Sequence, residues 1–243
     1  MNSYKLKYFL YNSNCLLIDW PQEINENISN DVNNFKRTIE SNFNNIVDVR
    51  SSYCSLFLIF ENKIKSLIEL EKKLSTLYNS RTYLDKKDRF LWNIPVCYEK
   101  TYGLDIEFVS KKNKIPVSDI IKKHCEKKYN LYLIGFLPGF LYLGSLHEDL
   151  HIPRKEEPRL RVPKGAVAIA NEQTGIYPQQ SPGGWNILGN TPISLFNKSK
   201  NKPCFANPGD KVKFFQITKD DYSVIEKQVE RGSYELTKKL IND

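Results

Sequence analysis

The run GFLPGFLYLG at residues 135–144 opens the stretch of sequence that decides the fold of this chain. Four related motifs follow it: PRKEEPRLRVPKG (153–165), QTGIYP (173–178), SPGGW (181–185) and GNTP (189–192). Glycine permits backbone conformations that other residues avoid, and proline fixes φ, so these motifs predict closely spaced turns in fixed positions. The residues expected to build these loops are Gly135, Pro138, Gly139, Pro153, Pro158, Pro163, Gly165, Gly175, Pro182, Gly183, Gly184 and Gly189.

Short apolar segments between and around these turns are expected to be strands. They lie at 91–97, 131–134, 166–170, 193–196 and 211–217. Two short helices are expected at 105–112 and 118–127, the second with Ser118 as its N-cap, and almost no helix is expected beyond Tyr129. Many short strands separated by glycine and proline turns are typical of a closed or nearly closed β-barrel.

The first ninety residues have a different pattern. Apolar residues recur with a helical period between Ile24 and Phe43 and again between Ile64 and Leu77. Segments with strand composition lie at 4–10, 15–20, 47–50 and 54–60. The order ββαββα predicts a small α+β domain at residues 1–85, followed by a mainly β domain at 86–243, with the boundary in the charged stretch DKKDR.

Composition limits the classes of function. The formal net charge is +8, but its clustering is modest: residues 111–128 carry seven lysines against Asp119 and Glu126. This stretch is interpreted as a solvated helix face, so no nucleic acid partner is expected. The five cysteines are widely spaced and form no CxxC pair, which indicates a reduced, cytoplasmic protein. The longest nearly apolar run, 131–143, is shorter than the roughly 20 residues of a membrane helix, so no membrane association is expected.

Residues 147–151, HEDLH, satisfy the HExxH pattern of zinc peptidases. That chemistry needs both imidazoles on one face of a helix, whereas Gly144 and Pro153 leave room for about two turns at most. A surface turn without a metal is therefore the favoured interpretation. The chain also contains no GxSxG, GxxxxGK[ST] or GxGxxG motif, so neither a serine hydrolase nor a P-loop nucleotide site is indicated.

His124 precedes an expected strand and follows a lysine-rich helix. It could orient or titrate, but a histidine at a helix C-terminus is commonly a favourable placement of charge, which is the preferred interpretation.

Arg154 and Arg159 are the strongest candidates for binding an anion. Each follows a proline, so each guanidinium starts from a stiffened backbone and could grip a carboxylate or phosphate with two hydrogen bonds. The alternative is a loop pinned to acidic residues such as Glu156 and Glu157. The remaining candidates are Gln173, Thr174 and Tyr177, expected as a second polar group, and Trp185, as a pocket wall or a plug of the barrel.

Taken together, these motifs, the later PGD at 208–210 and the upstream IPVCYEKTYGLDIEFV at 94–109 resemble the signature of the allophanate hydrolase subunit 1 family. The resemblance covers nearly the whole chain. It implies a cyclophilin-like β-barrel as the second domain, but it does not imply prolyl isomerase activity. Asn190 stands where members commonly have arginine, which removes one possible anion contact from that loop.

The resemblance also implies a function within a complex. The first hypothesis is a B-type component of an ATP-dependent 5-oxoprolinase, which hydrolyses 5-oxoproline to L-glutamate. Its partners would be a C-type component, homologous to subunit 2 of the family, and an A-type component of the lactam-utilisation kind. ATP would then be used by the complex and not held by a P-loop of this chain. The alternatives are a Kip-type inhibitor that binds a sporulation histidine kinase and the carboxyltransferase half of a urea carboxylase and allophanate system.

Overall fold

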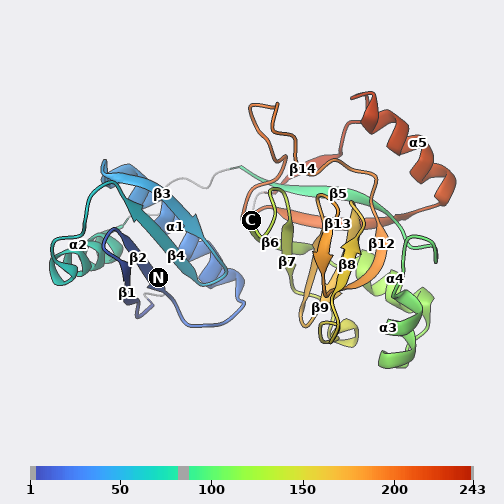
Figure 1. Cartoon of the computed structure of the whole chain (residues 1–243), viewed down its shortest axis with the longest axis horizontal. Helices are drawn as coiled ribbons and strands as arrows, with labels where there is room; N and C mark the ends of the chain where they lie inside the picture. The colour runs from blue at the N-terminus through green and yellow to red at the C-terminus, as the bar shows by residue number, and fades with distance from the viewer. Residues whose placement is uncertain (1–3, 82–87, 242–243) are drawn as a thin grey trace. The chain divides into compact units, whose positions relative to one another are not determined.

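The computed structural model describes residues 4–81 and 88–241. The chain divides into two compact units, Met1–Lys87 and Asp88–Asp243 (Figure 1). The boundary expected between residues 85 and 86 lies outside the described residues.

The first unit has the expected element order ββαββα. Its elements are β1 (Lys7–Asn12), β2 (Cys15–Asp19), α1 (Glu26–Asn42), β3 (Ile46–Ser51), β4 (Ser55–Phe60) and α2 (Leu67–Ser80). The strands form an antiparallel sheet in the order β1-β2-β4-β3. On β4, Leu56, Leu58 and Phe60 are buried while the alternating residues are half-buried, so the helices cover one face of this sheet.

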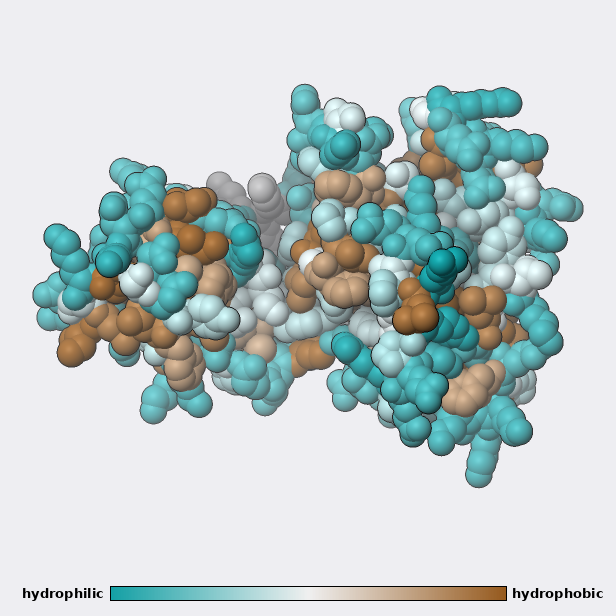
Figure 2. All heavy atoms as spheres, in the orientation of Figure 1, coloured by the Kyte–Doolittle hydropathy of each residue, from teal (hydrophilic) through white to brown (hydrophobic). Residues whose placement is uncertain are grey.

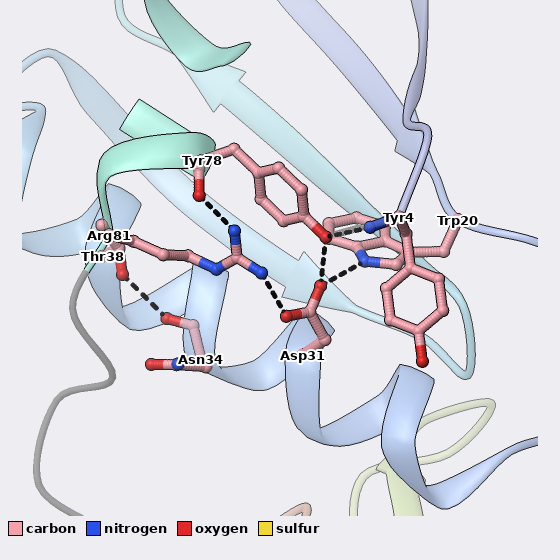
Figure 3. Close-up of polar contacts among 7 residues, drawn as sticks. All are labelled: Tyr4, Trp20, Asp31, Asn34, Thr38, Tyr78 and Arg81. Carbon is pink, nitrogen blue, oxygen red and sulfur yellow. Dashed lines mark hydrogen bonds and ion pairs between the residues drawn. The ribbon is translucent and has the colours of Figure 1, made fainter. Parts of the chain in front are cut away.

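A buried ion pair joins the two helices of this unit (Figure 3). Asp31 on α1 accepts a hydrogen bond from Trp20 Nε1 at 2.8 Å and another from the Tyr78 hydroxyl, and it pairs with the Arg81 guanidinium. Arg81 lies over the Tyr78 ring, 3.5 Å from its centroid. Because a buried carboxylate needs several donors, this cluster fixes the end of α2 against α1.

The second unit is a closed barrel with helices. Its elements are β5 (Arg89–Cys97), α3 (Ile106–Asn113), α4 (Val117–Glu126), β6 (Tyr129–Ile134), β7 (Leu141–Gly144), β8 (Arg159–Val162), β9 (Ala166–Ala170), β10 (Gln173–Ile176), β11 (Ser181–Gly183), β12 (Asn186–Asn190), β13 (Lys211–Ile217), α5 (Lys219–Glu230) and β14 (Lys238–Ile241). The sheet order is β12-β9-β10-β7-β6-β13-β5-β14. Pairing of Asn190 with Cys97 joins β12 to β5, which closes seven strands into a barrel and leaves β14 outside it.

Three expectations about this unit are wrong. Residues 193–196 form no strand: Ile193 and Leu195 are buried and alternate with exposed residues, but Phe196 makes only an isolated bridge to Cys204. The alternation of buried and exposed side chains in this segment therefore arises from packing against the core, and no ladder of backbone hydrogen bonds accompanies it. Helix α4 is capped by Pro116 with no side-chain hydrogen bond, so Ser118 lies inside the first turn. The twelve-residue helix α5, opened by a capping box at Thr218, was not expected.

Hydrophilic side chains cover most of the face drawn in Figure 2, with apolar patches on both units. Within residues 4–81 and 88–241, every helix is too short or too polar to cross a membrane.

Candidate functional site

Four aromatic rings form a cluster on the outer side of the barrel, which we call the aromatic wall: Phe140, Tyr142, Tyr177 and Trp185. The Phe140 ring lies 4.9 Å from that of Tyr177 and 5.6 Å from that of Trp185, both edge to face. The wall packs on β9, where alanines at 166, 168 and 170 face outward while Val167 and Ile169 face the barrel core. Small outward side chains leave the space that the rings fill.

Two glycines allow the rings to lie this close to the backbone. A Cβ atom on Gly175 of β10 would lie 2.9 Å from the Trp185 ring and 3.0 Å from the Phe140 ring. A Cβ on Gly183 would lie 2.3 Å from the Tyr177 hydroxyl oxygen. These distances are shorter than non-bonded atoms tolerate, so both glycines are required by close approach.

Arg154 lies at the edge of the aromatic wall. Its side chain is exposed and its guanidinium carbon is 5.9 Å from the centroid of the Trp185 ring. The preceding Pro153 carbonyl accepts a hydrogen bond from Asn186 Nδ2 at 2.9 Å, and the following Lys155 N–H donates to Gly184 O at 2.7 Å. Arg154 therefore projects from a backbone fixed on both sides, next to an aromatic face that favours a cation.

The charge of Arg154 reaches the neighbouring phenols. Burial raises the pKa of Tyr142 and of Tyr177. The positive charge of Arg154 lowers both pKa values, but burial has the larger effect. Both hydroxyls therefore stay protonated at neutral pH and can donate hydrogen bonds.

Arg159 has a different environment. Its two terminal nitrogens donate to Asp105 at 2.6 and 2.8 Å, and Asp105 also accepts from Lys155 Nζ at 3.1 Å and from the Ile187 N–H at 2.8 Å. Burial acts to raise the pKa of Asp105, but these donors outweigh it and hold the pKa below its usual value. The Pro-Arg steps thus give one exposed arginine and one that is paired, and the acid is Asp105 instead of the expected Glu156 or Glu157.

Asp105 was missed as a site residue by the sequence reasoning, which placed it only at the start of a helix. It is the N-cap of α3 but makes no side-chain hydrogen bond to the helix, and its side chain is 4% exposed. Its position within the motif at 94–109 was the available signal. The pairing with Arg159, 54 positions later, could not be read from local pattern.

Gln173, Thr174 and Tyr177 do not form one polar group. Since side chains alternate along a strand, Thr174 and Ile176 face into the barrel, whereas Tyr177 joins the aromatic wall and Gln173 is half-buried at the start of β10. Thr174 Oγ1 donates to Ala168 O at 3.1 Å and lies 2.9 Å from His124 Nε2.

His124 is fully buried inside the barrel, stacked on Phe214 with ring centroids 4.6 Å apart. Its Nδ1 lies 2.7 Å from the Tyr98 hydroxyl. Because Thr174 uses its own proton on Ala168, His124 donates from Nε2 and accepts from Tyr98 at Nδ1, as a neutral imidazole. Burial lowers its pKa to about 3. The interpretation of His124 as a favourable charge at a helix end is therefore wrong.

The HEDLH motif forms a single 3-10 turn, Glu148–Leu150. His147 Nδ1 accepts from the Asp149 N–H at 3.2 Å, while His151 Nε2 lies 3.2 Å from Leu146 O. The two imidazoles are therefore not one α-helical turn apart. Among the described residues, no three His, Cys, Asp or Glu side chains lie together as potential metal ligands.

Two motif residues of the second unit have structural partners. Asn190 donates from Nδ2 to Lys164 O at 2.9 Å and accepts from the Tyr222 hydroxyl at 2.9 Å, which ties α5 to the barrel. Asp210 of the PGD motif accepts from Phe90 N, Trp92 Nε1 and Asn207 N, each at 2.9 Å. These side chains fasten loops to strands.

Comparison with known proteins identifies the family of this chain and several of its relatives. Residues 6–206 match the family described as carboxyltransferase domain, subdomain C and D. The chain is 33% identical over 223 residues to the B subunit of 5-oxoprolinase from Bacillus subtilis, which covers 85% of this chain and 91% of that protein. It is 43% identical over 145 residues to the B subunit of 5-oxoprolinase from Haemophilus influenzae, 60% of this chain and 68% of that one.

A solved structure with the same fold is that of urea amidolyase from Kluyveromyces lactis. It superposes with a TM-score of 0.81 at 19% identity, over 98% of this chain and 16% of that longer one. The matches in sequence confirm the relationship inferred from the glycine and proline motifs. The chain therefore belongs to the family of carboxyltransferase domains, subdomains C and D.

Proposed function

We propose that this chain is the B subunit of an ATP-dependent 5-oxoprolinase, a cytoplasmic complex that hydrolyses 5-oxoproline to L-glutamate. The observation that carries the proposal is the 33% identity, over 91% of its length, to a protein of that name. The expected partners are a C-type component, homologous to subunit 2 of the family, and an A-type component of the lactam-utilisation kind.

In this proposal the chain supplies one side of a shared site. Arg154 offers an exposed guanidinium beside an aromatic face, which suits a small ring that carries a carboxylate. The Tyr142 hydroxyl, half-buried and protonated, adds a donor next to it. Asp105, with Arg159 and Lys155, fixes the loop from which Arg154 projects and is assigned a positioning role.

The residues of this chain do not fit ATP. Its sequence has no glycine-rich phosphate loop followed by lysine, and Arg159 and Lys155 are already paired with Asp105. We therefore assign ATP to a partner protein of the complex.

Reconstitution tests the proposal. The three proteins of the complex are mixed, and ADP release that depends on 5-oxoproline is measured with each of them omitted in turn. Activity is expected only when this chain is present. Undiminished turnover in its absence would refute the assignment, and binding of a histidine kinase in a pull-down would then favour the inhibitor function.

A further inference from the structure

Phe136, in the loop between β6 and β7, has a backbone conformation that bulky residues rarely adopt. Its φ is 65°, and the Leu137 N–H donates to Gly135 O at 2.8 Å, which makes the uncommon, strained form of γ-turn. Its side chain is nevertheless 63% exposed. Strain of this kind persists only where the surrounding structure imposes it, and it concentrates at binding sites. The loop therefore presents an aromatic ring to solvent from a fixed position.

The second half of this loop is fixed as well. The Phe140 N–H donates to Leu137 O at 3.0 Å across a turn in which Gly139 has a φ of 89°. A Cβ atom on Gly139 would lie 2.6 Å from the Phe196 Cβ, so the turn packs closely on that residue. Phe196 is itself 38% exposed. Two partly exposed phenylalanines therefore belong to one region of the surface.

Residues 196–204, which we call the basic hairpin, project from the barrel (Figure 1). An isolated bridge between Phe196 and Cys204 closes this segment, and the Asn197 N–H donates to Pro203 O at 2.8 Å. Three lysines of the segment are exposed: Lys198, Lys200 and Lys202.

The charge of the basic hairpin is not balanced by nearby acids. The sequence contains no aspartate or glutamate between Glu172 and Asp210. Asp210 is 2% exposed and already accepts three hydrogen bonds. Within residues 4–81 and 88–241, none of the three lysines forms an ion pair with an acidic side chain. The hairpin is thus a positively charged rim beside the two phenylalanines.

Exposed aromatic anchors bordered by polar residues are typical of protein interfaces. A fixed anchor also loses little conformational entropy on binding, which favours affinity. Two partly exposed phenyl rings offer less apolar area than one acyl chain, which alone binds a membrane only marginally, so a protein partner is favoured over a membrane. The Phe140 ring lies 5.8 Å from that of Phe136 and 5.6 Å from that of Trp185, so this region adjoins the aromatic wall.

We infer that Phe136, Phe196 and the lysines of the basic hairpin form a docking surface for an acidic protein. The Phe136 ring enters an apolar pocket of that protein, and the lysines face carboxylates around the pocket. The inference rests on the proposed function, since the partner is taken to be the C-type or the A-type component of the complex. A partner bound here would lie next to the aromatic wall and could complete the shared site.

Biolayer interferometry with the immobilised full chain tests this inference, with the C-type and A-type components as separate probes. Phe136→Ala removes the anchor, and Leu160→Ala, which removes an 85% exposed apolar side chain on β8, is its control. K198E/K200E/K202E reverses the charge of the hairpin. K111E/K112E/K128E makes the same change of charge at three other exposed lysines and is its control. Circular dichroism melting shows whether each variant is folded.

We expect saturable binding of one component by the wild type. Phe136→Ala and K198E/K200E/K202E should each weaken it about tenfold or more, and their controls less than about threefold. Raising NaCl from about 0.05 to about 0.5 M should weaken wild-type binding about tenfold and that of K198E/K200E/K202E much less. The salt titration and the second test variant decide the outcome if one variant does not fold.

The outcomes separate this inference from the proposed function. If a component binds but both test variants bind it as the wild type does, or the controls lose as much affinity as the test variants, the docking surface is overturned and the proposed function stands. Binding of neither component would refute both. Vesicles of anionic phospholipid and a single-stranded oligonucleotide are comparison probes. Binding of either through the basic hairpin, with no binding of a component, would assign the surface to another class of partner and overturn the inference.

Discussion

Arg154 and Arg159 each follow a proline, yet the two side chains have opposite environments. Arg154 is exposed beside Trp185, and Arg159 donates twice to the buried Asp105. Sequence identified both positions because a Pro-Arg step is visible in it. It could not separate an exposed guanidinium from a paired one, since the partner acid lies on a distant segment.

Replacing Arg154 with alanine is expected to reduce turnover of the reconstituted complex. A lost charge-assisted hydrogen bond corresponds to about 1.5–3 kcal/mol, so kcat/KM for 5-oxoproline should fall about 10–100-fold, mainly through KM. Because the side chain is exposed, the melting temperature should stay within about 1 °C. Arg161→Ala, an exposed arginine on β8, is the control and should behave as the wild type. Equal losses in both variants would remove Arg154 from the site.

Arg159→Ala is expected to act on stability first. It leaves the Asp105 carboxylate, which is 4% exposed, with fewer donors. The free energy of unfolding should fall by about 1–3 kcal/mol in urea titration, whereas Arg154→Ala should leave it nearly unchanged. Unchanged stability in Arg159→Ala would contradict the positioning role of this pair.

His124 makes stability depend on pH. Its pKa is about 3 in the folded chain, below the ordinary value near 6.5, so the unfolded state binds a proton first as pH falls. The contribution of neutral His124 to the free energy of unfolding is fully present above pH 6.5 and is lost progressively between pH 6.5 and 3. Between pH 7.5 and 5.5 this contribution should decrease by about 1.4 kcal/mol, and His124→Gln should remove that decrease. His147→Gln is the control, and a similar loss of pH dependence there would contradict the assignment to His124.

At the scale of the elements, the packing of β10 depends directly on the missing side chain of Gly175. A methyl group on Gly175 would contact the Trp185 and Phe140 rings and the Leu141 carbonyl oxygen at 2.9 to 3.0 Å. Gly175→Ala should therefore destabilise the chain by about 1–3 kcal/mol and shift the tryptophan fluorescence. At Gly184 the nearest atom is 3.7 Å away, so Gly184→Ala is the matched control with a small expected effect. A tolerated Gly175→Ala would show that the rings can move.

Elements were predictable where one local signal dominated. The segments 166–170 and 211–217 agree with β9 and β13 because apolar composition and flanking turns coincide there. The segment 193–196 also has apolar residues, but it forms only an isolated bridge at Phe196 and no ladder of backbone hydrogen bonds with a neighbouring strand. The surroundings of Asp105 and of the inward-facing Thr174 side chain depend on which strands close the barrel. A local sequence pattern does not contain that information.

At the scale of the whole molecule, the two units have separate hydrophobic cores. The main cluster of the barrel draws all its residues from positions 90–236, and that of the first unit draws its residues from positions 4–78. Residues 88–243 expressed alone are therefore expected to unfold cooperatively. Circular dichroism should show a single transition within about 5 °C of a transition of the full chain. A fragment without a cooperative transition would show that the barrel needs the first unit.

Strand β5 also sets an order of events during synthesis. Leu91 pairs with Lys211, which is made 120 positions later, and Cys97 pairs with Asn190. At about 5–20 residues per second, β5 leaves the ribosome on the order of ten seconds before β13 exists. The ββαββα unit, whose contacts are local, can fold during that interval, whereas the barrel must wait for residue 217. A nascent chain arrested before that residue should bind chaperones through β5, and release should follow within seconds of completing β13.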